Sequence, residues 1–210
     1  MPQQLPRLAA ALVLAGSVAC AHAGSTHRAG GFKLTSAEIA PGGTIAQEQV
    51  FSGFGCTGGN VSPSLQWSGA PAGTKSFALL VHDPDAPTGG AGWWHWVVAN
   101  IPASVNTLPK GIGKAENANH SSGARQLRTD FGAPGWGGPC PPVGDKPHRY
   151  RFTLYALGVD KLDIPADATA SLAGYLINAN AIGRAKLTGY YGRATPEVPL
   201  AEQKPAEAAK

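Results

Sequence analysis

The chain has 210 residues and a formal net charge of +4, and it contains 28 glycines and 18 prolines while charged residues make up only 14% of it. This length fits one domain with a sizeable core, and the many turn-forming residues favour short strands over long helices. The lysines and arginines are spread along the chain without a basic run, which argues against a nucleic-acid-binding protein.

Residues 1–23 have the pattern of a signal peptide. Arg7 precedes the short apolar run 8–16, and Ala21-His22-Ala23 places small residues around a cleavage site. The apolar run falls short of the roughly 20 residues that a membrane-spanning helix needs. We therefore predict cleavage after Ala23, a periplasmic or secreted protein, and no transmembrane segment in the mature chain. A lipoprotein anchored at Cys20 is an alternative, as is a buried N-terminal helix.

The rest of the chain divides by composition into three parts. Residues 24–31 are polar and predict a flexible segment, residues 32–193 carry the apolar patterns of one folded domain, and residues 194–210 have almost no core-forming side chains, as expected of a disordered tail. Within the domain, the continuous apolar runs 77–81 and 94–101 predict strands that are buried on both faces.

One clear alternation and several shorter patterns complete the prediction of an all-β domain. Residues 148–155 alternate with a period of two, which places His148, Tyr150, Phe152 and Leu154 on one face of a strand. The spacing of apolar residues predicts one helix over 168–183. Further short strands are predicted at 32–36, 48–51, 64–68 and 185–191, with a loop rich in glycine and serine over 52–63.

Three segments place polar side chains at the ends of predicted strands, beside stiff loops rich in proline or glycine. They are Asp83-Pro84-Asp85-Ala86-Pro87 after the first buried strand, Trp93-Trp94-His95-Trp96 at the start of the next, and Gly135-Trp136-Gly137-Gly138-Pro139-Cys140-Pro141-Pro142 ahead of His148 and Tyr150. If these strands are neighbours in a sheet, their ends meet at one rim, where the prolines help to pre-form a pocket.

The side chains in these segments suit an anion. Two imidazoles, a phenol and glycine-rich backbone can donate hydrogen bonds, and Asp83 would favour the protonated form of a nearby histidine. Tryptophans supply apolar walls, and no strong nucleophile stands among these residues. The segments therefore favour a binding protein that holds a small phosphate-like group, without a cofactor, over an enzyme.

In this order, the three segments resemble those of the phosphatidylethanolamine-binding protein family, and within it the bacterial Raf-kinase-inhibitor-like branch. Gly55-Cys56 with Asn60-Val61-Ser62-Pro63 upstream, and Leu187-Thr188-Gly189-Tyr190 near the end, extend the resemblance over about residues 32–193. The resemblance implies an all-β fold, an antiparallel Greek-key β-sandwich with one or two short helices, one of them C-terminal.

The resemblance also implies which residues hold the anion. The family's pocket maps onto Asp83, His95, His148 and Tyr150, with walls and backbone donors from Ala86, Pro87, Trp93, Gly138, Cys140 and Pro142. Family members bind phosphate-bearing headgroups such as phosphoethanolamine or phosphorylated residues, and some inhibit kinases or proteases, so a protein partner is a further expectation. Trp136, Asn180 and Leu127 depart from residues that are frequent in the family at these positions.

Alternatives remain open at this point. Cys56 and Cys140 are the cysteines left after removal of the leader, and in an oxidising compartment they could form a disulfide or stay free. A free Cys140 beside His148 would resemble the nucleophile–base pair of a weak hydrolase. Asp83, His95 and His148 together could instead ligate a metal such as zinc. Each histidine could also be a hydrogen-bonded core residue.

Overall fold

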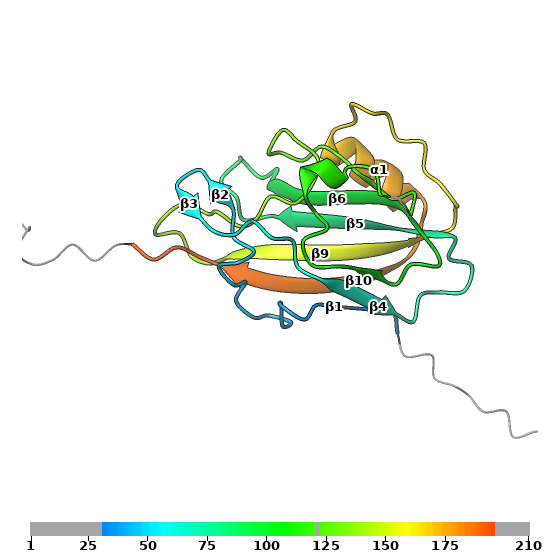
Figure 1. Cartoon of the computed structure of the whole chain (residues 1–210), viewed down its shortest axis with the longest axis horizontal. Helices are drawn as coiled ribbons and strands as arrows, with labels where there is room; N and C mark the ends of the chain where they lie inside the picture. Colours follow the sequence, from blue (N-terminus) through cyan, green and yellow to red (C-terminus); the bar gives the residue numbers. More distant parts are fainter. Residues whose placement is uncertain (1–30, 121, 196–210) are drawn as a thin grey trace, which may run out of the picture.

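A large antiparallel sheet forms the centre of the molecule, as Figure 1 shows for this computed structural model, which describes residues 31–120 and 122–195. Its strands are β5 (Ser76–Asp83), β6 (Trp93–Pro102), β8 (Arg125–Gln126), β9 (His148–Leu157) and β10 (Ala181–Tyr191). They lie in the order β10-β9-β5-β6-β8. Strands β5, β6, β8 and β9 therefore form a Greek key, because β9 returns to lie beside β5.

A smaller sheet covers one face of the large one. Its three strands lie in the order β1 (Lys33–Thr35), β4 (Leu65–Ser68) and β7 (Thr107–Leu108). A short hairpin of β2 (Ser52–Gly53) and β3 (Cys56–Thr57) lies at one end of the molecule. The helices of the described residues are η1 (Ala115–Asn117), which is one turn of 3-10 helix, and α1 (Ala170–Ala179), which packs against β6 and β9.

Apolar side chains fill two layers, one on each face of the large sheet. Successive residues of a strand point to opposite faces, so β5 places Leu79 between the two sheets and Leu80 beneath α1. The inter-sheet layer also contains Trp67 of β4 and Phe152 of β9. The outer layer contains Ile177 of α1. Because both faces are covered, the central strands are continuous apolar runs.

The predicted fold class is confirmed: the structure is an antiparallel Greek-key β-sandwich with few short helices. The strands predicted at 77–81 and 94–101 are the centres of β5 and β6. In β9, the four side chains predicted to share a face are all buried between the sheets or at their edge.

Three element predictions need correction. Residues 48–51 form turns rather than a strand, since the backbone N–H of Gln49 donates to Ala46 and that of Val50 donates to Gln47. The segment 52–63, predicted as loop, contains the β2–β3 hairpin. The helix predicted over 168–183 is shorter, because Asn180 ends α1 and β10 begins at the next residue.

The predicted signal peptide over 1–23, the rest of the N-terminal segment to residue 30, and residues 196–210 of the tail lie outside the described residues. The predictions for them stay predictions. Within residues 31–120 and 122–195, no helix combines the length and the apolar character that crossing a bilayer requires.

Candidate functional site

Strand register brings the three polar segments to one rim of the large sheet. Asp83 ends β5 and is paired with Trp93 at the start of β6. On its other side β5 runs beside the start of β9, where His82 is paired with Arg151. The antiparallel order therefore places the end of one strand beside the beginnings of its two neighbours, as the sequence predicted for neighbouring strands.

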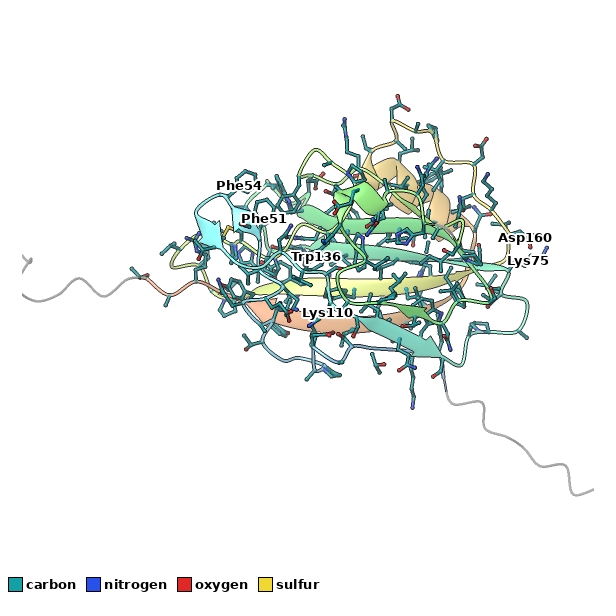
Figure 2. The ribbon with its side chains drawn as sticks, in the orientation of Figure 1. Phe51, Phe54, Lys75, Lys110, Trp136 and Asp160 are labelled. Carbon is teal, nitrogen blue, oxygen red and sulfur yellow. A yellow bond between two sulfur atoms is a disulfide. The ribbon has the colours of Figure 1, made fainter. Side chains whose placement is uncertain are left out.

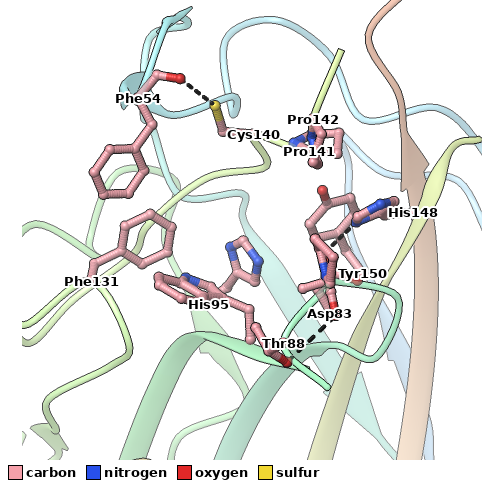
Figure 3. Close-up of a pocket in the computed structure, with 13 residues that line it drawn as sticks. Phe54, Asp83, Thr88, His95, Phe131, Cys140, Pro141, Pro142, His148 and Tyr150 are labelled. Carbon is pink, nitrogen blue, oxygen red and sulfur yellow. Dashed lines mark hydrogen bonds and ion pairs between the residues drawn. The ribbon is translucent and has the colours of Figure 1, made fainter. Parts of the chain in front are cut away.

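A cavity of about 240 Å³ opens at this rim (Figure 3). Phe54 and Phe131 lie on one side of it and His148 and Tyr150 on the other. Its lining contains Asp83, Ala86, Pro87, Trp93, His95, Cys140, Pro142, His148 and Tyr150 of the predicted residues, and Phe54, Thr88, Phe131 and Pro141 besides. No lysine or arginine is among these described residues.

Asp83 orients His148. The carboxylate Oδ2 of Asp83 lies 2.8 Å from Nδ1 of His148, and its Oδ1 accepts the backbone N–H of Asp85 at 2.8 Å. Asp83 and His148 are both buried. With both of its oxygens engaged, Asp83 fixes the imidazole ring and the following turn. At the other ring nitrogen, Nε2, His148 lies 3.4 Å from the half-exposed carboxylate of Asp145.

Asp85 belongs to the framework of the site. Its carboxylate accepts hydrogen bonds from Nε and Nη2 of Arg149 at 2.8 and 2.6 Å. Hydrogen bonding to this guanidinium holds the pKa of the Asp85 carboxyl well below its ordinary value. The pair ties the loop after β5 to the first residues of β9, and so keeps Asp83 close to His148.

His95 is held in a neutral form. Its Nδ1 lies 2.6 Å from the carbonyl oxygen of Gly137, and a carbonyl can only accept, so Nδ1 carries the hydrogen. Burial lowers the pKa of His95 to about 4. Nε2 is then the nitrogen left for the cavity, and it is an acceptor. The expectation that both imidazoles donate to an anion is therefore wrong for His95 near neutral pH.

Tyr150 brings a buried hydroxyl without a partner. Its ring packs edge-on against His95, with 5.0 Å between the ring centroids. Among the described residues, no group hydrogen-bonds to its buried Oη. Burial raises the pKa of the phenol well above its ordinary value, so the hydroxyl keeps its hydrogen and can donate it. A buried donor left unbonded costs about 1–3 kcal/mol.

Aromatic side chains form the opposite wall. The rings of Phe54 and Phe131 stack with 6.0 Å between centroids, and Trp93 meets Phe131 edge-on at 5.6 Å. Phe54 is 71% exposed and has a backbone φ of 51°, which is rare for a bulky side chain. Figure 2 shows Phe54 at the hairpin end of the molecule, far from the Lys75–Asp160 ion pair at the other end. The cavity therefore combines a polar side with an exposed apolar one.

A disulfide joins Cys56 of β3 to Cys140, 84 residues further along the chain. Arg193 reinforces the junction, since its Nη2 donates to the carbonyl of Gly55 at 2.8 Å and its Nη1 to that of Pro141 at 3.4 Å. The disulfide settles the alternatives that the sequence left open for these cysteines. It also removes the free Cys140 thiol that a nucleophile–base pair with His148 would need.

The metal alternative lacks a ligand set. Within residues 31–120 and 122–195, no group of three or more His, Cys, Asp and Glu side chains is arranged to hold a metal ion. Oδ2 of Asp83 and Nδ1 of His148 are hydrogen-bonded to each other, and Nδ1 of His95 is hydrogen-bonded to the carbonyl oxygen of Gly137. The three side chains therefore do not converge as ligands.

Gly138 is a correction to the predicted site. It does not line the cavity, and its N–H donates to Oδ1 of Asn60 at 2.8 Å instead of facing a ligand. A Cβ at Gly138 would clash with the backbone carbonyl oxygen of Gln49. Glycine is needed here because two backbone segments approach closely, and this contact positions the segment that carries Gly137 and Cys140.

Residues 35–192 match the family model for phosphatidylethanolamine-binding proteins. The chain belongs to the phosphatidylethanolamine-binding protein (PEBP) family. It is 52% identical over 164 residues to the UPF0098 protein YbcL of Escherichia coli, a match that covers 78% of this chain and 89% of YbcL. The crystal structure of YbcL, described as a member of the mammalian PEBP family, matches with a TM-score of 0.74 at 53% identity and covers 77% of this chain and 98% of that one.

Other PEBP relatives are more distant. The PEBP homologue CT736 of Chlamydia trachomatis has a TM-score of 0.65 at 31% identity, over 78% of this chain and 98% of that one. LppC of Mycobacterium tuberculosis, which is named as a lipoprotein, is 41% identical over 138 residues, or 66% of this chain and 63% of LppC.

The departures from the PEBP pattern have structural roles. Trp136 is buried, stacks on Phe152 and donates its Nε1–H to the carbonyl of Gln49 at 3.1 Å. Asn180 caps the end of α1, where its side chain donates to the carbonyl of Leu176. Leu127 is buried in the outer core layer. None of these three lines the cavity described above.

Proposed function

We propose that this PEBP-family protein holds a phosphate monoester, such as the phosphoethanolamine headgroup, in the cavity beside His95, His148 and Tyr150. The observation that carries the proposal is the unpartnered hydroxyl of Tyr150, a buried donor beside a pocket that opens to solvent. A ligand oxygen would supply the acceptor that this hydroxyl lacks, which offsets the cost of burying it.

The opposite wall indicates what the phosphate is attached to. Phe54, Phe131 and Trp93 present aromatic surface at the mouth of the cavity, and the exposed Phe54 has no polar role. A phosphate with an organic substituent would place its charge near Tyr150 and its carbon atoms against these rings. A phosphorylated side chain on a partner protein, such as a kinase or protease, presents the same chemistry.

The substitution Tyr150→Phe tests the proposal with the least disturbance. It removes one oxygen atom, so we expect affinity for phosphoethanolamine, measured by titration calorimetry, to fall about tenfold. The free energy of unfolding should stay unchanged or rise slightly, because a buried unbonded group is lost. Tyr175→Phe, on the exposed side of α1, is the matched control and should bind as the wild type does. Equal affinity of the Tyr150→Phe variant would reject this site.

A second set of variants addresses the imidazoles. Phosphoethanolamine should shift the NMR signals of both rings, and His95→Ala combined with His148→Ala should abolish binding. Retained affinity in this double variant, with the fold intact by circular dichroism, would place the ligand elsewhere.

We further propose that the chain is exported. The N-terminal pattern supports this, as does the disulfide, which persists in oxidising compartments. A relative named as a lipoprotein, LppC, is a cell-envelope candidate of the same family. Intact-mass measurement of the protein from a periplasmic fraction should find a chain that begins at Gly24. A mass that includes the first 23 residues, or an added lipid at Cys20, would contradict cleavage after Ala23.

A further inference from the structure

A second groove lies on the opposite face of the large sheet from the cavity. It measures about 350 Å³ and is bordered by β5, β6, β9, β10 and the end of α1. In each of β5, β6 and β9, one residue lines the cavity and an adjacent residue lines the groove. The groove residues His82, Trp94 and Arg151 are the chain neighbours of Asp83, His95 and Tyr150 in the cavity. Alternation along the strands sends these neighbours to opposite faces.

Three cations line this groove: Arg151 on β9, and Arg184 and Lys186 on β10. In the strand register, Lys186 is paired with Thr153, and Arg151 with Thr188. Arg151 and Lys186 are therefore diagonal neighbours on one face, and Arg184 lies two residues from Lys186. Diagonal side chains of this kind start about 7–8 Å apart. Like charges on neighbouring side chains repel each other, and an anion bound between them would offset that repulsion.

Within the described chain, no carboxylate balances these charges. No aspartate or glutamate lines the groove, and none of the three cations takes part in an ion pair of the described residues. Arg149, the next outward-facing residue of β9, shows the contrast, because Asp85 binds it. The positive field of the groove is thus left open to an external anion.

Arg184 is held in place by neutral groups. Its guanidinium lies 5.3 Å from the centre of the Tyr155 ring, and its Nη2 donates to Oδ1 of Asn178 at 2.8 Å. Both contacts fix the side chain without cancelling its charge. On the other border the ring of His82 packs at a tilt against that of Trp94, with 4.2 Å between ring centroids. The groove therefore has one positioned guanidinium, two further cations and an aromatic border.

We propose that this groove is a second anion site and that it binds a multivalent oligophosphate, an anion with at least two linked phosphate groups. Arg151 is paired with Thr188, which is four residues along β10 from Arg184, or about 13 Å at the rise of a strand. Linked phosphate groups can therefore contact cations at both ends of the groove. Guanidinium groups pair with phosphate oxygens in a bidentate manner, which suits the two arginines. This site does not depend on the cavity on the other face.

The test is a calorimetric titration of tripolyphosphate into the mature protein at low ionic strength. Arg151→Gln combined with Lys186→Gln should weaken binding about tenfold or more. Lys33→Gln combined with Lys161→Gln removes the same charge from exposed positions away from the groove, and should change affinity by less than about twofold. The groove variant should bind phosphoethanolamine as the wild type does, which separates this site from the cavity.

Several outcomes would overturn the inference. Equal losses in the groove variant and the charge-matched control would mean that only net charge attracts the anion. Unchanged affinity in the groove variant, with melting temperature as a check of its fold, would exclude the groove. Binding of anionic lipid vesicles without binding of tripolyphosphate would show a membrane-docking surface instead.

Discussion

His95 determines which protonation state of a phosphate the proposed site prefers. Its Nδ1–H is committed to Gly137, and the ring is neutral near pH 7 because burial lowers its pKa to about 4. The nitrogen that remains for a ligand is an acceptor. A phosphate oxygen is favoured there when it carries a hydrogen, as in the monoanion of a phosphate ester. Sulfate esters have no such hydrogen.

The wild-type protein should therefore bind methyl phosphate about tenfold more tightly than methyl sulfate near pH 6. As the pH rises above the second pKa of the ester, about 6, the protonated form disappears and affinity should fall. His95 itself contributes nothing to this fall, because its pKa of about 4 leaves it neutral throughout. Calorimetric titrations of both esters from about pH 6 to about pH 8 measure both effects.

The control for this prediction is His95→Asn, whose amide offers donors as well as an acceptor. This variant should lose most of the preference for phosphate over sulfate and much of the pH dependence. Equal binding of the two esters by the wild type, or an affinity that rises with pH, would contradict the assignment of Nε2 as an acceptor.

At the residue scale, the cavity residues that could be predicted from the sequence are those that stand in recognisable motifs at strand ends. Asp83, His148 and Tyr150 lie beside strand ends in recognisable segments, and the structure places all three around one cavity. Phe54 and Phe131 were missed because they stand in loops without a motif, and only the folding of the hairpin brings them together. The direction of the Gly138 N–H was also beyond prediction, since it depends on Asn60, which is distant in sequence.

At the element scale, the pattern of apolar residues predicted two kinds of strand. These are strands buried on both faces, such as β5, and strands with a clear alternation of apolar and polar residues, such as β9. It failed for residues 48–51, where an apolar pair resembles a strand but hydrogen bonds close turns within four residues. The hairpin strands β2 and β3 are too short to show a period. Their pairing rests on tertiary contacts, including the disulfide to a distant segment.

In the part of the chain that the structure describes, α1 is the one α-helix, and its short length explains how one sheet could carry both proposed sites. Alternation predicts that Arg149, Arg151 and Thr153 share the face opposite His148 and Tyr150, and the structure confirms this arrangement. What the sequence does not indicate is how far α1 extends over that face. The helix ends at Asn180, so it covers Leu80 and Ala78 but leaves the cationic part of the sheet open.

At the scale of the whole molecule, a few long-range ties fix the hairpin end. The disulfide connects Cys56 to Cys140, and Arg193, just after the last strand, bonds to backbone carbonyls on both sides of it. Phe54 lies between the two hairpin strands that this junction holds. The stability of the fold and the shape of the cavity mouth therefore depend on the same contacts. We expect the disulfide to matter more for stability than for the shape of the mouth.

Replacing both cysteines, Cys56→Ser with Cys140→Ser, should lower the free energy of unfolding by about 2–5 kcal/mol, because the disulfide closes a loop of 84 residues in the unfolded chain. Urea denaturation followed by tryptophan fluorescence measures the loss, and the wild type in reducing agent should match the variant.

Affinity for phosphoethanolamine should fall only a few-fold in the native state, since Arg193 still holds the hairpin, and adding Arg193→Gln should weaken binding further. An unfolding free energy equal to that of the oxidised wild type would show that the disulfide adds nothing to the stability of the fold. Complete loss of binding in the folded double-cysteine variant would show that Arg193 does not hold the hairpin by itself.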